Sequence, residues 1–153
     1  MELKKYLIFI IVLSFTNFSH ADVIKPAENL TAYDVVKIQL NALKNNNKPS
    51  KNSGIMQTWI FAHPENKKFT GPYERFEKML LGNQYIFLLD HDSHRIKLIM
   101  NTKVKYIYNI ELISKEKKMY FYEWHLEKIT TDGCSNCWFT TIVSPPTDKG
   151  NTI

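Results

Sequence analysis

KYIYNIELISKEKKMYFYEWHLEK, residues 105–128, holds two runs of alternating apolar and polar residues with a short charged segment between them. One side of each run is apolar and largely aromatic: Tyr106, Tyr108, Ile110 and Leu112 in the first, and Tyr120, Tyr122, Trp124 and Leu126 in the second. Side chains alternate across a β-strand with period two, so each run reads as a strand with one buried face. Because residues 114–118 form a charged turn between the runs, we predict an antiparallel hairpin.

The residues before this hairpin have helical spacing instead. Thr31 and Asp34 approximate a capping box, and apolar residues then recur at helical spacing through residues 32–45. Further helices are predicted over residues 54–62 and from Pro72 to about residue 81. Shorter strand-like runs occur at residues 85–89, 95–100 and 137–143. Helices followed by antiparallel strands predict an α+β fold in which N-terminal helices pack on one face of a curved, mainly antiparallel sheet.

A corner is predicted between the second and third of these helices. Pro64 is expected to end one helix and Gly71-Pro72 to open the next. Between them, Asn66 and Thr70 are expected to bond the backbone groups left free at those helix ends. We interpret this corner as architecture, with the alternative that its loop rims a site.

The first 21 residues have the three parts of a secretory signal peptide. Lys4 and Lys5 precede an apolar run of about ten residues, and Ser19-His20-Ala21 follows as a small-residue end. The run is shorter than the roughly 20 residues that a membrane span needs. We therefore expect export to the periplasm or the exterior after cleavage near Ala21. An N-terminal arm at residues 22–30, one domain at residues 31–145 and a loose tail at residues 146–153 would follow.

Composition limits the classes of partner. The chain has 153 residues and a net charge of +5. Its aromatic content of 13% is typical of a protein with a hydrophobic core. The lysines are scattered and no basic face with interleaved aromatic residues is evident, so nucleic-acid binding is not expected. No second apolar stretch reaches 18 residues, so we expect no membrane span in the mature chain.

Two short motifs could carry chemistry. Cys134-x-x-Cys137 leads into a strand rather than a helix, which does not favour a redox pair, and a zinc site would need two more ligands. A disulfide formed after export, or two free thiols, is the plainer interpretation. Asp90-His91-Asp92-x-His94 could bind a metal or act as acid and base, but it falls where a turn between strands is expected. We predict no catalytic residue, no metal site and no cofactor.

Three other motifs follow one another along the chain. They are Asp34-Val35-Val36 with Gln39-Leu40 and Ala42-Leu43; Phe61-Ala62-x-Pro64-Glu65-Asn66-Lys67 with Thr70-Gly71-Pro72, Arg75-Phe76 and Met79; and Tyr122-x-Trp124-x-Leu126 with Cys137-Trp138-x-Thr140 and Val143. With them the chain resembles, over residues 31–145, an uncharacterised family called domain of unknown function 4864. That family is in or close to the nuclear-transport-factor-2-like superfamily of cone-shaped α+β folds. The insertion at residues 45–52 and Cys134 depart from its pattern. The resemblance implies the fold and carries no established activity.

The aromatic face has two interpretations. It can be core, or it can line a pocket between sheet and helices, as cones of this kind often do. Tyrosines suit a pocket because each has an apolar body and a hydroxyl. The candidate pocket residues are Trp59, Tyr106, Tyr108, Tyr122, Trp124 and Trp138.

Three kinds of function are compatible with these patterns. The first is an exported, non-catalytic ligand-binding or accessory protein that takes a small apolar or aromatic ligand. The second is a small enzyme of the isomerase or dehydratase type, which would need a carboxylate or histidine on an inner face where we assign mostly tyrosine, tryptophan and aliphatic residues. The third is an interaction protein that forms a homodimer through its open sheet face.

Overall fold

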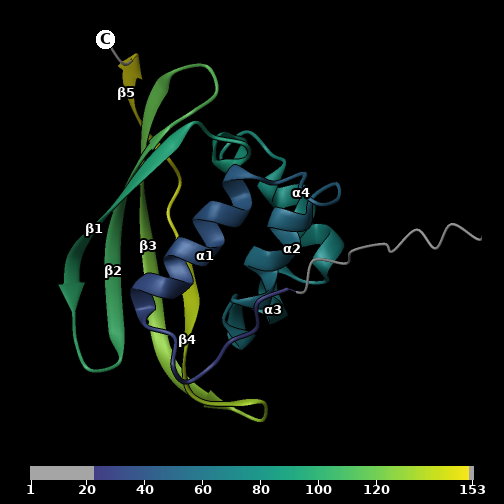
Figure 1. Ribbon diagram of the computed structural model, residues 1–153, viewed down its shortest axis with the longest axis vertical. Coiled ribbons are helices and arrows are strands. Elements are labelled where there is room, and N and C mark those ends of the chain that lie inside the picture. Colours follow the sequence, from purple (N-terminus) through teal and green to yellow (C-terminus); the bar gives the residue numbers. More distant parts are fainter. Residues whose placement is uncertain (1–22, 152–153) are drawn as a thin grey trace, which may run out of the picture.

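Ten elements follow one another in residues 23–151, the part of the chain that the computed structural model describes (Figure 1). They are α1 (Ala32–Lys44), α2 (Ser53–Ile60), α3 (Pro64–Thr70), α4 (Tyr73–Leu80), the 3₁₀ turn η1 (Ile86–Leu88), β1 (Ser93–Asn101), β2 (Lys105–Ile113), β3 (Lys118–Thr131), β4 (Cys134–Val143) and β5 (Thr147–Asn151). The order confirms the predicted α+β class. The predicted signal peptide, residues 1–21, lies outside the described residues.

The sheet is built around its longest strand, β3. β2 pairs with it in the predicted hairpin register, with Tyr108 opposite Trp124 and Ile110 opposite Tyr122. β1 pairs with the other side of β2, so the strand order is β1-β2-β3-β4 with every pairing antiparallel. β4 and β5 share the remaining side of β3, β5 beside its first residues and β4 beside its last. This confirms the curved antiparallel sheet.

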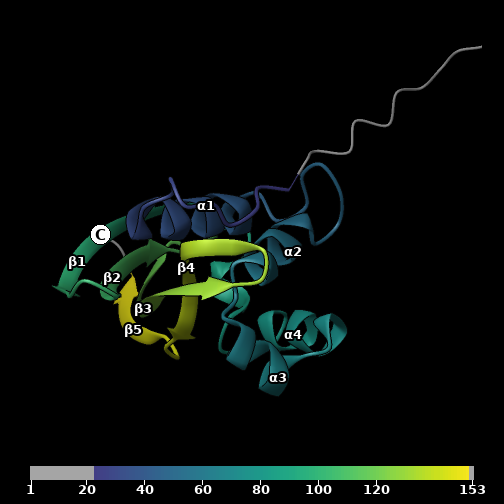
Figure 2. The same cartoon turned by 90° about the horizontal axis from the view of Figure 1, so that it is seen from below.

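The helices form a layer on one side of the sheet (Figures 1 and 2). α1 lies along the sheet and begins at the predicted capping box, in which Thr31 and Asp34 bond each other's backbone N–H groups. Its apolar stripe, which includes Leu40 and Leu43, is buried in the same hydrophobic core as the aromatic face of β2 and β3. Burying one such leucine side chain is worth about 1.5–3 kcal/mol, so tertiary packing holds this helix in place.

Two segments differ from the sequence predictions in the helical layer. Residues 64–70, expected as a loop, form α3, because Pro64 occupies the first helical turn and the His63 ring caps it by accepting a hydrogen bond from the N–H of Glu65 at 3.1 Å. Residues 85–89, expected as strand-like, contain η1 instead. Consecutive turns carry the chain from Gly82 into η1, with the N–H groups of Tyr85 and Ile86 both donating to the Gly82 carbonyl.

The two ends of the described chain are also held. The tail that follows Pro145-Pro146 was expected to be loose. It forms β5 at Thr147–Asn151, which pairs with the start of β3. The arm at residues 23–30 is irregular, as predicted, and Gln57 fixes it. The Gln57 side chain accepts from the Ile24 N–H at 2.8 Å and donates to the Ile24 carbonyl at 2.7 Å. None of the helices in the described part of the chain has the length and apolar character that a bilayer crossing requires.

Gly54 sets how closely α2 approaches α1. A Cβ atom at this position would lie 2.2 Å from the Ala42 carbonyl oxygen and 2.9 Å from the Asn46 Cα, both backbone atoms. We expect Gly54→Ala to lower the free energy of unfolding by about 1–3 kcal/mol, because the two helices must separate. Urea denaturation measures this effect. Gly133→Ala is the matched control, since no atom lies within 4 Å of its added Cβ. Equal destabilisation by both substitutions would contradict the close approach.

Candidate functional site

A cavity of about 270 Å³ lies between β4 and the helical layer. Side chains from α1, α2, α3, α4, η1, β3 and β4 meet around it. The lining is mainly apolar: Gln39, Thr58, Ala62, Asn66, Thr70, Phe76, Met79, Leu80, Tyr85, Leu88, Trp124, Thr140, Thr141, Ile142 and Val143. It therefore lies between the sheet and the helices, and of the six predicted pocket residues only Trp124 lines it.

A buried polar network crosses one wall of this cavity. The Gln39 side-chain oxygen accepts from the Trp124 indole N–H at 3.0 Å and from the Thr140 hydroxyl at 2.6 Å. The Gln39 amide also donates to the Thr58 carbonyl at 3.2 Å. Gln39 is fully buried, and all four residues line the cavity. Because each polar group has a partner, the network fixes the wall and links α1, α2, β3 and β4.

Side chains from the helical layer attach to the edge of β4 around the cavity. The Asn66 amide of α3 donates to the carbonyl oxygens of Thr141 and Thr140, and the Tyr85 hydroxyl donates to the Val143 carbonyl at 3.1 Å. Thr140 also forms a parallel bridge with Ala62, through backbone hydrogen bonds to its neighbours Phe61 and His63. These attachments hold the helices beside β4 while the cavity remains between them. Asn66 thus bonds a strand, not the helix end that the sequence pattern predicted for it.

Ionisable groups are scarce at this site. Among the described residues that line the cavity there is no carboxylate, histidine, lysine or arginine. Tyr85 is the one lining residue there with a titratable side chain, and burial raises the pKa of its hydroxyl. A neutral lining of this kind suits dispersion contacts with an apolar molecule and offers no group for proton transfer near pH 7.

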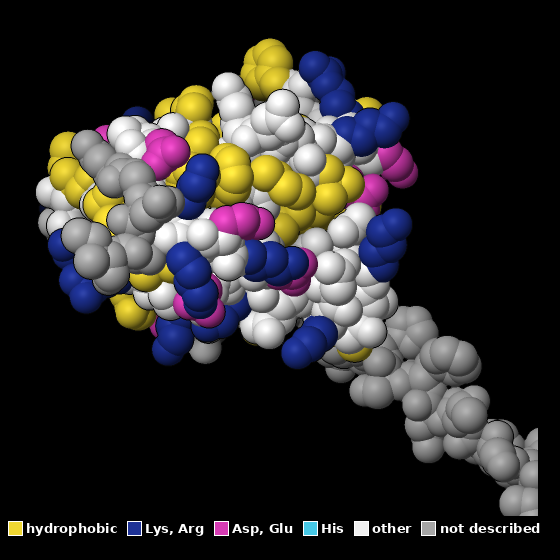
Figure 3. Space-filling model, turned by 90° about the horizontal axis from the view of Figure 1, so that it is seen from above, with side chains coloured by type: hydrophobic (Ala, Val, Ile, Leu, Met, Phe, Trp, Pro, Cys, Tyr) yellow, Lys and Arg dark blue, Asp and Glu magenta, His cyan; other side chains and the backbone are white. Residues whose placement is uncertain are grey.

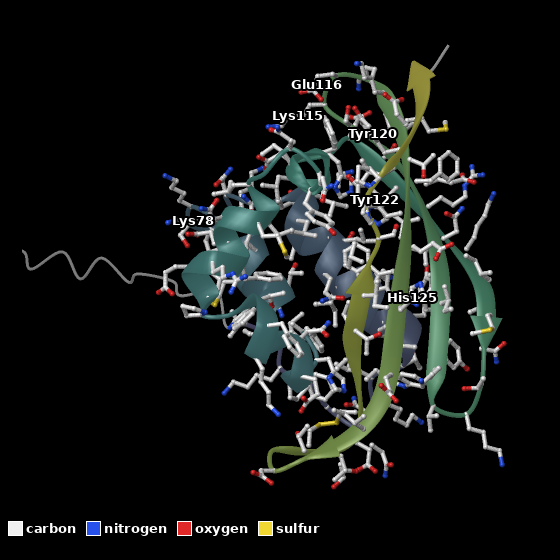
Figure 4. The ribbon with its side chains drawn as sticks, turned by 180° about the vertical axis from the view of Figure 1, so that it is seen from behind. Lys78, Lys115, Glu116, Tyr120, Tyr122 and His125 are labelled. Carbon is white, nitrogen blue, oxygen red and sulfur yellow. A yellow bond between two sulfur atoms is a disulfide. The ribbon has the colours of Figure 1, made fainter. Side chains whose placement is uncertain are left out.

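The six predicted pocket residues are divided between four places. Trp124 lines the cavity. Tyr122 is buried in the core, where its hydroxyl donates to the Gln84 carbonyl at 3.4 Å; it follows Tyr120 along β3 in Figure 4. Trp59 lies within the helical layer, with its ring 5.1 Å from that of Phe76 and 5.2 Å from the Lys67 ammonium.

Tyr106, Tyr108 and Trp138 gather in a separate open groove of about 480 Å³ where α1 begins. The rings of Tyr106 and Trp138 are 4.9 Å apart, and those of Tyr106 and Tyr108 are 6.0 Å apart. Burial, together with Tyr106, Asp34 and Tyr33, raises the pKa of Tyr108 to about 12. The structure therefore brings three of the predicted residues together, but at the start of α1 and outside the cavity.

In the Asp90-to-His94 motif, residues 90–92 form the turn that leads into β1, and His94 lies in the strand. His91 is buried, with its Nδ1 2.7 Å from the Leu88 carbonyl oxygen and its Nε2 2.7 Å from His94 Nδ1. Asp90 and Asp92 form ion pairs with Lys115 and Lys117 of the next turn, at 3.3 and 2.7 Å. Figure 4 labels Lys115 on that turn. Within residues 23–151 no group of three or more histidine, cysteine, aspartate or glutamate side chains could hold a metal ion.

A third hollow, of about 350 Å³, adjoins this turn and includes the exposed Leu81 and Ile86. The face seen in Figure 3 carries a band of hydrophobic side chains bordered by lysine or arginine and acidic residues. The two cysteines form a Cys134–Cys137 disulfide at the start of β4, with a Cα separation of 5.9 Å and Cys137 fully buried.

Several cavity residues were not singled out as a site from the sequence. Gln39 lies in the buried stripe of α1, where a polar residue among apolar ones signals an internal hydrogen-bond network. Ile142 has no such signal, because its neighbours in the cavity come from distant elements. Comparison of the chain with protein-family models, curated proteins and solved structures finds no match.

Proposed function

We propose that this protein is an exported, non-catalytic domain that binds a small apolar or aromatic ligand in the cavity between β4 and helices α3 and α4. The observation that carries the proposal is a cavity with a mainly apolar lining and an internally bonded polar wall. Export is inferred from the signal-peptide pattern of residues 1–21. The layer of helices on a curved sheet, with a cavity between them, supports a nuclear-transport-factor-2-like cone.

The dimensions and chemistry of the cavity narrow the ligand. At about 270 Å³ it lies just below the roughly 300–1,000 Å³ of typical small-molecule sites, so it suits a single ring system or a short chain. The polar atoms of Gln39 and Thr140 already bond each other, so an apolar ligand leaves no buried group unsatisfied. A charged ligand would find no counter-ion among the lining residues.

The same lining weighs against the isomerase or dehydratase alternative. Such chemistry requires a base or acid within hydrogen-bond reach of the substrate. His91 lies in the turn before β1 and its partner His94 lies at the start of β1, and neither residue lines the cavity. No other feature of the described residues favours catalysis there, so ligand binding is the function that the cavity supports best.

Indole and p-cresol are suitable probes for the cavity, and the Trp124 indole N–H is a built-in reporter. We expect either compound to shift the Trp124 indole signal in a ¹⁵N–¹H correlation spectrum, because that N–H lies in the cavity wall. Met79→Trp places a larger side chain in the lining and so reduces the space for the ligand. It should raise the dissociation constant at least about tenfold, because burying an apolar group the size of one side chain is worth about 1.5–3 kcal/mol.

Met56→Trp is the matched control for this substitution. Met56 and Met79 are both helical methionines with similar exposure, 36% and 38%, but Met56 does not line the cavity. We expect it to leave the dissociation constant unchanged. If neither probe shifts the Trp124 signal, or if both tryptophan variants weaken binding equally, the cavity is not the binding site.

A further inference from the structure

The β1–β2 hairpin has an unusual charge distribution. From Ser93 to Ile110 the chain contains four basic residues and no aspartate or glutamate: Arg95, Lys97, Lys103 and Lys105. All four side chains are exposed. The backbone N–H of Lys128 on β3 donates to the Val104 carbonyl at 2.8 Å, which brings a fifth basic residue beside the turn. This end of the sheet is therefore strongly cationic.

Large apolar side chains are exposed among these basic residues. Leu98, Ile99, Met100 and Val104 have 52%, 54%, 46% and 47% of their surface accessible to solvent. We call residues 97–105, all of which are exposed, the hairpin tip. Single exposed apolar residues need no explanation, but four within seven positions form a patch of the kind found at interaction surfaces.

The shape of the tip keeps this patch available. β1 is the outer strand of the sheet, and within the described residues no element pairs with its free side. Figures 1 and 2 show β1 at the margin of the sheet, away from α2, α3 and α4. The Thr102 hydroxyl holds the turn by accepting from the N–H groups of Val104 and Lys105, at 3.3 and 2.9 Å. A β-bulge at Ile99 adds local irregularity to the free edge.

Two carboxylates partly offset the basic residues. Glu111 lies 3.5 Å from Arg95 and 2.5 Å from Lys97, and Glu127 lies 4.0 Å from Lys105. Four basic side chains of the hairpin therefore face two acidic ones, and the Lys128 ammonium lies 5.0 Å from the Trp138 ring. Lysines alone could serve to protect a sheet edge from pairing, but a protected edge would not also present Leu98, Ile99 and Met100 to solvent.

We propose that the hairpin tip docks on the surface of an anionic phospholipid bilayer. Its lysines would lie at the level of the lipid headgroups, and Ile99, Met100 and Val104 would enter the boundary with the acyl chains. Exposed apolar residues flanked by basic ones bind such surfaces through both buried area and electrostatic attraction. A second copy of this chain is a poorer partner, because pairing two tips would bring their basic residues together. This inference is independent of the ligand cavity.

Co-sedimentation with vesicles tests the docking. One vesicle type contains three parts phosphatidylcholine to one part phosphatidylglycerol, and the other is phosphatidylcholine alone. We expect the protein to sediment with the anionic vesicles, and binding to fall as salt is raised. The double variant Lys97→Gln/Lys103→Gln should reduce partitioning about 30-fold, which corresponds to about 1 kcal/mol per lysine at the membrane surface. Ile99→Ser/Val104→Ser should also reduce it, without changing the net charge.

Two matched controls separate the tip from the rest of the surface. Lys48→Gln/Lys51→Gln removes the same charge from the loop between α1 and α2, and Met56→Ser/Phe69→Ser removes exposed apolar residues from α2 and α3. Both should partition like the parent chain. The proposal is overturned if anionic vesicles do not bind the protein, or if control and tip variants lose binding equally. It is also overturned if ultracentrifugation shows a dimer that only the tip variants dissociate, which would make the tip a contact between copies.

Discussion

Trp124→Ala is expected to remove about 3–5 kcal/mol from the free energy of unfolding, a large share of the roughly 5–15 kcal/mol that stabilises most domains. The Trp124 side chain is fully buried, and its indole N–H donates to both Gln39 and Thr140, at 3.0 and 3.2 Å. The substitution therefore leaves a void and removes a donor from the network that links α1 to β4. Urea denaturation followed by circular dichroism measures the loss.

Two further variants separate packing from hydrogen bonding at this position. Trp124→Phe keeps most of the ring volume and removes the N–H, so a cost of about 1–3 kcal/mol is expected. Phe69→Ala, at a side chain that is 73% exposed, should change stability by less than about 0.5 kcal/mol. If Trp124→Ala costs no more than Phe69→Ala, the indole does not support the cavity wall.

The void left by Trp124→Ala would join the existing cavity, because the indole forms part of the cavity lining. Indole has the shape of the group removed, so it should bind there and restore part of the lost stability in proportion to its concentration. The parent chain should gain less from the same concentration. This comparison also reports whether apolar molecules reach the cavity from solvent.

The strongest periodic patterns predicted their elements well. The hairpin of β2 and β3 has the predicted turn and the predicted buried faces, because an apolar face with period two can satisfy only one register. α1 begins after Thr31, as its capping box indicated, and ends at Lys44. In both cases the local pattern and the tertiary burial favour the same structure.

Other elements depend on contacts that local patterns do not contain. Pro64 can end a helix or begin one, and here His63 caps a new helix while Asn66 fixes it to β4. β5, which follows Pro145-Pro146, forms because β3 extends past the residues that pair with β4 and leaves its first residues for β5. A sequence that lacks strong periodicity does not reveal such long-range partners.

The candidate site shows the same limit. Alternation identified which aromatic residues face the helices, but not where space would remain between the two layers. Tyr122 packs in the core, and Tyr106 and Trp138 meet in the groove where α1 begins. The sequence also placed His91 in a turn without indicating that its side chain is buried, and this burial changes how readily the imidazole takes up a proton.

His91 is expected to make the protein less stable in mild acid. Burial, which outweighs the hydrogen bond to Leu88, lowers the pKa of His91 from 6.5 to about 4. In the unfolded chain the pKa returns to about 6.5, so between these values the unfolded state binds a proton that the native state does not. The contribution of the neutral His91 side chain to stability is complete above about pH 6.5 and is lost as pH falls toward about 4. Urea denaturation at a series of pH values should show the free energy of unfolding falling from about pH 7 to about pH 5, by up to about 1.4 kcal/mol per pH unit.

His91→Gln identifies the origin of this slope. Glutamine cannot titrate, so the variant should be less sensitive to acid between about pH 7 and about pH 5, whatever its stability at neutral pH. His94 contributes in the same direction, because burial and the nearby Lys44 lower its pKa as well, so some slope should remain. The carboxyl groups with lowered pKa, such as that of Asp92, act only in more acidic solution, since their ordinary values lie near about 4. An unchanged slope in His91→Gln would show that His91 is hydrated in the native protein, because only an enclosed imidazole resists protonation in this range.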